Sequence, residues 1–244
     1  MKRETLYKKR RRGDVRMMIT TGKQRVKIMA ELANQYAKLG NAEKAEELFQ
    51  RAVQETDRLE EQKEREAMFA HLANEFASIN HFDKALAYLD RITNQEVYVK
   101  TIWKLVNKIA KAGNSTLAEN LLLQGIDIAQ KIETPLLKSE LLTGSGASYR
   151  HIDYSRGVAL VEEAYQLATQ IEEPYHKAIL FNEIGANYID VKEKEKALEV
   201  FSQAHSLVAA ISSTVEKAQV LAMLGGELAE KGREKGQRIF WKKR

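Results

Sequence analysis

Three asparagines recur at one position of a repeated sequence pattern, and they are the sharpest polar feature of this chain. They are Asn34, Asn74 and Asn107. An asparagine amide carries both hydrogen-bond donors and an acceptor, so it can pair with the peptide groups of a bound polypeptide without reading its side chains. These residues predict a surface that binds an extended protein segment.

Cationic side chains accompany the asparagines. Lys100 and Lys104 are four residues apart, which places them on one face of a helix. Lys27 lies seven residues before Asn34, and Arg150, with His151 and Asp190, is expected at the same surface further along the chain. A solvated helix end is the alternative interpretation of these last three residues.

The chain lacks the residue patterns on which enzyme and metal sites depend. Cysteine is absent, which excludes disulfides, thiolate metal sites and thiol catalysis. The five histidines share no metal-binding spacing, and there is no glycine-rich phosphate loop. We therefore predict a protein without enzymatic activity, cofactor or metal.

The elements that must position these residues follow from an internal repeat. From Leu32, small, aromatic and turn-forming residues stand at offsets 1, 4, 8, 13, 17 and 20, and the same residue classes return five more times. The small residues are 40, 33, 40, 39 and 40 positions apart. They lie at 33, 73, 106, 146, 185 and 225.

Each repeat reads as two helices joined by a tight turn. Offsets 1 and 4 share one face of a helix, offset 8 suits a left-handed helix end, and offsets 13, 17 and 20 share one face of a second helix. Pro135 and Pro174 each suit the first turn of a helix. First helices are predicted at 24–39, 63–79, 97–112, 136–151, 176–190 and 216–231, and second helices at 42–58, 82–92, 115–132, 155–171 and 194–210, with a short last one from 234.

At these residues the chain resembles the tetratricopeptide repeat family. The segments ELANQYAKLGNAEKAEELFQRAV (31–53) and EIGANYIDVKEKEKALEVFSQA (183–204) carry the resemblance, which extends over about residues 23–241. The family's usual unit has about 34 residues, so the longer intervals here predict longer second helices. A HEAT-type repeat has a similar period, but its residue classes fit less well.

The resemblance implies an all-α, right-handed solenoid of about six stacked antiparallel helix hairpins, whose concave groove binds a peptide or protein segment. Asn34, Asn74, Lys100 and Lys104 are similar to most of a carboxylate clamp, which grips the C-terminal carboxylate of a peptide. The fifth clamp residue would be a lysine where this chain has Ala30, and Lys27 is one turn away. Generic groove asparagines beside solvated lysines are the alternative.

Charge divides the chain into three predicted parts. Residues 1–22 form a basic segment of net charge +6, residues 23–232 the helical repeat domain, and residues 233–244 an incomplete last hairpin. Residues 231–244 also carry +6, so the body between the ends is acidic. These ends leave nucleic-acid or anionic-surface binding and self-assembly near Phe240 and Trp241 as alternative functions, beside plain solubilising tails.

The sequence has neither a secretory signal nor a run of about 18 apolar residues. A cytoplasmic location without membrane insertion is therefore expected.

Overall fold

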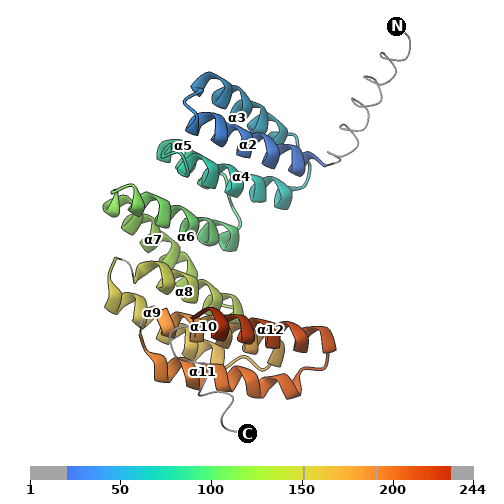
Figure 1. Cartoon of the computed structure of the whole chain (residues 1–244), viewed down its shortest axis with the longest axis vertical. Coiled ribbons are helices and arrows are strands. Elements are labelled where there is room, and N and C mark those ends of the chain that lie inside the picture. Colours follow the sequence, from blue (N-terminus) through green and yellow to red (C-terminus); the bar gives the residue numbers. More distant parts are fainter. Residues whose placement is uncertain (1–20, 151, 191, 232–244) are drawn as a thin grey trace, which may run out of the picture. The chain divides into compact units, whose positions relative to one another are not determined.

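The computed structural model describes residues 21–150, 152–190 and 192–231, with side chains described as far as residue 226. Within these residues it contains 11 α-helices and no strand. The helices form two compact units, Met1–Asn114 and Ser115–Arg244, each built from antiparallel helix hairpins (Figure 1). The structure confirms the predicted all-α fold of stacked hairpins.

The predicted helices up to residue 231 are confirmed, since every described boundary lies within three residues of its prediction, while the short last helix predicted from 234 lies outside the described residues. The first unit contains α2 (Gly22–Lys38), α3 (Ala42–Asp57), α4 (Gln62–Ala77), α5 (Phe82–Leu89) and α6 (Gln95–Lys111). The second contains α7 (Ser115–Gln130), α8 (Pro135–Tyr149), α9 (Tyr154–Thr169), α10 (Pro174–Asp190), α11 (Lys194–Leu207), the 3₁₀ turn η1 (Val208–Ala210) and α12 (Thr214–Lys231).

Four hairpin turns place a residue in the left-handed conformation at the predicted offset. They are Gly40, Asn80, Gly113 and Lys192, with φ between 61° and 88°. Asp153 stands at offset 8 of the fourth repeat, where the pattern also predicts a left-handed residue, but its φ is −133° and its side chain caps α9 by accepting from the Arg156 amide. The expectation for Asp153 was wrong because its repeat is one residue shorter, which turns this position into an N-cap.

The second repeat is shorter than its neighbours, and the missing residues come from its second helix. The interval after position 73 is 33 residues rather than 40, and α5 has 8 residues where α3 has 16. This confirms that repeat length is set by the second helix. Because α5 is half as long as α3, it cannot extend alongside the whole of α3.

Glycine marks the closest approach of two helices in the second unit. A Cβ atom on Gly185 of α10 would lie 2.8 Å from the Phe201 ring of α11. Phe201 is only 1% exposed, so it fills the space that the missing side chain leaves. Gly185 therefore stands where two helices touch, as the repeat pattern predicted.

Candidate functional site

A half-buried lysine, Lys108, bridges α6 and α4 on the surface formed by the first helices α2, α4 and α6 of the first unit. The Lys108 Nζ of α6 donates to the Asn74 side-chain oxygen at 2.6 Å, to the Asn74 carbonyl at 3.0 Å and to the Ser78 Oγ at 2.6 Å. All three acceptors are neutral and belong to the end of α4. Across the described residues, no carboxylate lies within ion-pair distance of this ammonium group.

The electrostatic surroundings of Lys108 disfavour its charge. Burial lowers the pKa of Lys108 below its ordinary value, and the positive charges of Lys38 and Lys104 lower this pKa further. Glu75 acts in the opposite direction. We call Lys38, Lys104 and Lys108 the lysine cluster. The Lys108 ammonium thus lies near two further positive charges and the Glu75 carboxylate, so an added anion would find a favourable potential here.

Asn34 has its amide turned toward the neighbouring helix. Its Nδ2 donates to the Glu75 Oε2 at 2.7 Å and to the Glu75 carbonyl at 3.2 Å. The residue is 2% exposed, and its buried side-chain oxygen has no hydrogen-bond partner among the described residues. Asn34 therefore joins α2 to α4, and its buried oxygen is closed to solvent.

His71 of α4 is the second buried polar group of this surface. Burial is the main cause that lowers the pKa of His71, while the charges of Glu75 and Glu31 act against it. The His71 Nε2 is buried without a partner in the described part of the chain. Burial thus favours the neutral imidazole, which lies beside Glu75.

The remaining predicted site residues of the first unit are more exposed. Lys27, Lys104 and Asn107 are exposed to solvent on α2 and α6. Lys100 forms an ion pair with Glu96, one turn earlier on its own helix, at 2.8 Å. Of the predicted residues, Asn74 is hydrogen-bonded to Lys108, and the charge of Lys104 acts on Lys108. Asn34 is hydrogen-bonded to Glu75, the carboxylate that also acts on Lys108.

Arg150 belongs to the second unit, where it joins two first helices. Its guanidinium lies 2.9 Å from Asp190 and donates to the Asn187 side-chain oxygen at 3.2 Å. The contact with Asp190 was not foreseen, although both residues were expected on the same surface. His151 falls outside the described residues, as do Phe240, Trp241 and nearly all of the basic ends.

Sequence reasoning missed Lys108 and Ser78. Lys108 is one helical turn after Lys104, so the i, i+4 rule that linked Lys100 to Lys104 applied equally to it. The repeated asparagine drew attention to Asn107 instead, which is exposed. Ser78 gave no signal, because its part in the site depends on how α4 and α6 pack.

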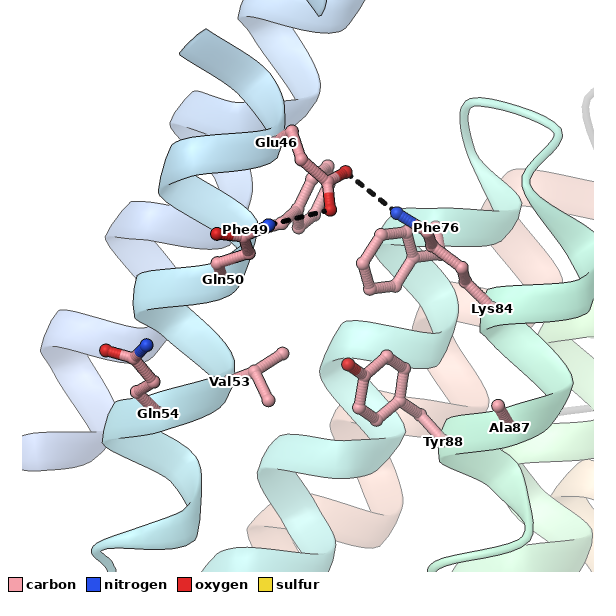
Figure 2. A pocket seen from close by; sticks show the side chains of 9 residues that line it. All are labelled: Glu46, Phe49, Gln50, Val53, Gln54, Phe76, Lys84, Ala87 and Tyr88. Carbon is pink, nitrogen blue, oxygen red and sulfur yellow. Dashed lines mark hydrogen bonds and ion pairs between the residues drawn. The ribbon is translucent and has the colours of Figure 1, made fainter. Parts of the chain in front are cut away.

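A separate pocket opens between α3 and α5, on the second helices of the same unit (Figure 2). It has a volume of about 360 Å³ and arises beside the short α5. Its floor is a stack of aromatic rings, with Phe49 4.2 Å from Phe76 and Phe76 5.4 Å from Tyr88 between centroids. The other lining residues are Glu46, Gln50, Val53, Gln54, Lys84 and Ala87.

The polar groups of this pocket largely satisfy one another. Lys84 closes one end through a 2.7 Å ion pair with Glu46, which also lowers the pKa of the Glu46 carboxyl (Figure 2). Gln50 donates to the same carboxylate at 3.3 Å. The pocket can receive an apolar side chain over its rings, but it offers no unpaired charge for recognition.

Two further observations concern metals and membranes. No group of three or more metal-ligating side chains occurs among the residues that the structure describes. None of the described helices combines the length and the apolar character that crossing a membrane would require.

Comparison with known proteins gives structural neighbours only. No family model and no curated protein matches the chain. The crystal structure of Ton1535 from Thermococcus onnurineus NA1 is similar over 67% of this chain, at 18% sequence identity and a TM-score of 0.58. The chain spans about half of that protein, 47% of its length. BtubC (BKLC) from P. vanneervenii is similar at 20% identity and a TM-score of 0.44, covering 75% of this chain and 79% of that one. These likenesses concern the fold alone.

Proposed function

We propose that this chain is a tetratricopeptide-type scaffold that binds a segment of another protein and catalyses no reaction. The binding surface is the first-helix surface of the first unit, and the lysine cluster recognises an acidic group of the partner. The observation that carries the proposal is the Lys108 ammonium, which is half-buried among three neutral oxygens and flanked by two further lysines. The family resemblance supports the same surface.

The neutral shell around Lys108 argues for a ligand rather than a purely structural role. A buried charge is normally paired with an opposite charge, because desolvation disfavours it otherwise. A carboxylate placed between Lys104 and Lys108 would supply that opposite charge and raise the pKa of Lys108 again.

A charged ligand group also accounts for the departures from the clamp pattern. Ala30 removes one expected lysine from α2, while Lys38, at the end of the same helix, acts on Lys108. We therefore expect the acidic group of the partner to bind near α6, at Lys104 and Lys108, rather than midway along α2. A C-terminal carboxylate and an aspartate or glutamate side chain share this chemistry.

The test is capture of peptides by the intact chain on two matched arrays, one displaying free C-terminal carboxylates and the other C-terminal amides. Lys104→Ala and Lys108→Met should each weaken capture roughly 10–100-fold, since a charge-assisted hydrogen bond contributes about 1.5–3 kcal/mol. Lys111→Ala removes the same charge from an exposed position of α6 and serves as the control.

The arrays also separate the two acidic groups. Loss of capture on the amide array assigns a C-terminal carboxylate, whereas capture on both arrays of peptides rich in aspartate or glutamate assigns side chains. Binding that is indifferent to both lysine substitutions and to peptide charge would refute the proposed site.

A further inference from the structure

The aromatic residue at offset 4 of a repeat joins neighbouring hairpins at two places in the second unit. The Tyr188 hydroxyl of α10 donates to the Glu162 carboxylate of α9 at 2.7 Å. The Tyr149 hydroxyl of α8 donates to the Glu119 carboxylate of α7 at 3.1 Å. Each tyrosine therefore bonds its first helix to the second helix of the preceding hairpin. At the same offset, α4 of the first unit has Phe76, which carries no hydroxyl.

The Tyr188 hydroxyl is one of three donors around the Glu162 carboxylate. The Lys196 ammonium of α11 lies 3.1 Å from this carboxylate and 5.5 Å from the centre of the Tyr188 ring. Gln166, one turn after Glu162 on α9, donates to it at 3.3 Å. A carboxylate has about four acceptor positions, so it accommodates all three donors.

Glu46 of α3 has the same neighbours except for the hydroxyl. The Lys84 ammonium of α5 lies 2.7 Å from the Glu46 carboxylate and 5.5 Å from the centre of the Phe76 ring. Gln50, one turn after Glu46, donates to it at 3.3 Å. Among the described residues, these two side chains are the donors to Glu46. The carboxylate can therefore accept one more bond, at the position that its counterpart in α9 uses for a tyrosine.

This carboxylate lies at one end of the 360 Å³ pocket beside α5 (Figure 2). Phe49 and Phe76 form the base of the pocket and are each only 2% exposed. Val53 of α3 and Tyr88 of α5 are half-buried and point toward one another across it. Small-ligand sites have volumes of about 300–1,000 Å³. This pocket is near the lower limit, so it suits one side chain rather than a large cofactor.

The pocket is open because α5 is short. In the second unit, Tyr165 stands three residues after Glu162 and is hydrogen-bonded to Gln203 of α11 at 3.2 Å. Phe49 stands three residues after Glu46, but α5 has no equivalent of Gln203. Gln203 is the tenth residue of α11, which begins at the same offset as α5, and α5 has only 8 residues. The first unit therefore leaves uncovered a position that α11 covers in the second.

We propose that this pocket binds the side chain of a tyrosine from a segment of another protein. The phenol ring packs between Val53 and Tyr88, and its hydroxyl donates to Glu46, as a tyrosine of α10 does to α9. Ring stacking and a charge-assisted hydrogen bond both favour this side chain over an aliphatic one. Glu46 and Lys84 neutralise each other, so the pocket favours a neutral group. This inference does not depend on the ligand of the lysine cluster.

Nuclear magnetic resonance of the intact chain tests the site with N-acetyl-tyrosinamide, which presents the side chain between two peptide groups. The probe should shift the signals of the Val53 methyl groups and the Ala87 amide, both at the pocket. N-acetyl-phenylalaninamide should bind about 5–10-fold more weakly, because it lacks the hydrogen bond to a charged but half-exposed group. N-acetyl-leucinamide, which also lacks the ring, should bind more weakly still.

Three variants test the role of the carboxylate. Glu46→Gln should remove most of the preference for tyrosinamide over phenylalaninamide. Glu47→Gln makes the same charge change at the next residue, which is exposed, and should keep the preference. Phe76→Tyr supplies the hydroxyl from within the chain, as Tyr188 does in α10, so it should also remove the preference.

Several results would overturn the proposal. Absence of shifts at Val53 and Ala87 with every probe would show that the pocket does not bind such side chains. Equal affinity for tyrosinamide and phenylalaninamide would contradict recognition through Glu46, and equal affinity for leucinamide would contradict recognition of the ring. Lys108→Met should bind the probe like the wild type, so failure here and failure of the lysine cluster are distinguishable.

Discussion

Replacing Gly185 by leucine should destabilise the second unit through a single identifiable clash. The added Cβ would lie 2.8, 2.9 and 3.0 Å from three atoms of the Phe201 ring. Optimal carbon–carbon contact is at about 3.5–4.0 Å, so the ring must move by roughly 0.5–1 Å. Phe201 is 1% exposed and surrounded by packed side chains, so it has no free space to enter.

The expected loss in the free energy of unfolding is the cost of overpacking minus a gain in helix propensity. Overpacking a filled core costs about 1–3 kcal/mol, occasionally more, while removing a glycine from a helix interior returns up to about 1 kcal/mol. The net change should be a destabilisation of about 1–2 kcal/mol, measured as a lower urea midpoint in far-ultraviolet circular dichroism. Gly226→Leu gives the propensity gain without the clash, so it should be neutral or stabilising.

A double-mutant cycle isolates the contact itself. Phe201→Ala alone should cost about 3–5 kcal/mol, because it empties a buried site. Combined with Gly185→Leu it should cost clearly less than the sum, since the new leucine fills part of the space. Wild-type stability for Gly185→Leu, or strict additivity in the cycle, would show that these two residues do not touch.

Two further predictions concern buried titratable groups of the first unit. The pKa of His71 is lowered from 6.5 in the folded state, so the unfolded chain binds the proton more readily and stability should fall as pH drops below about 6.5. The variant His71→Gln should therefore show a smaller difference in urea midpoint between pH 7.5 and pH 5 than the wild type. An unchanged difference would contradict this. Glu66 is 5% exposed and accepts from the backbone amides of Thr93 and Asn94 at 3.3 and 3.2 Å, at the start of α6. Glu66→Gln should therefore lower the melting temperature by a destabilisation of about 1–3 kcal/mol, and a variant that melts with the wild type would show that these bonds do not stabilise the helix.

The repeated apolar pattern was sufficient to predict the helices because each is defined locally. The small residue at one repeated offset predicted that Gly185 lies where two helices touch, and the structure shows that Phe201 makes this contact. The short interval after position 73 predicted the short α5 in the same way. Such patterns succeed since hairpin packing depends on periodicity along one or two neighbouring helices.

The candidate binding surface was predicted only in part. Asn34 and Asn74 were correctly placed at one repeat position, but nothing in the repeat pattern indicates that their amides bond to Glu75 and Lys108. Lys100 was favoured as the partner of Lys104, whereas the structure pairs it with Glu96. A charged side chain on a helix can turn toward several neighbours, and the choice depends on groups that are distant in sequence.

By itself the sequence determined the all-helical hairpins, their phase and the glycines at close contacts, because these follow from local periodicity and backbone conformation. Only the tertiary structure decided which polar groups meet between hairpins. It buried Asn34 against Glu75, surrounded the Lys108 ammonium with three neutral oxygens and opened the aromatic pocket beside α5. Those features depend on the spacing and rotation of neighbouring helices. The pKa of each titratable side chain then depends on the burial and the partners that this packing provides.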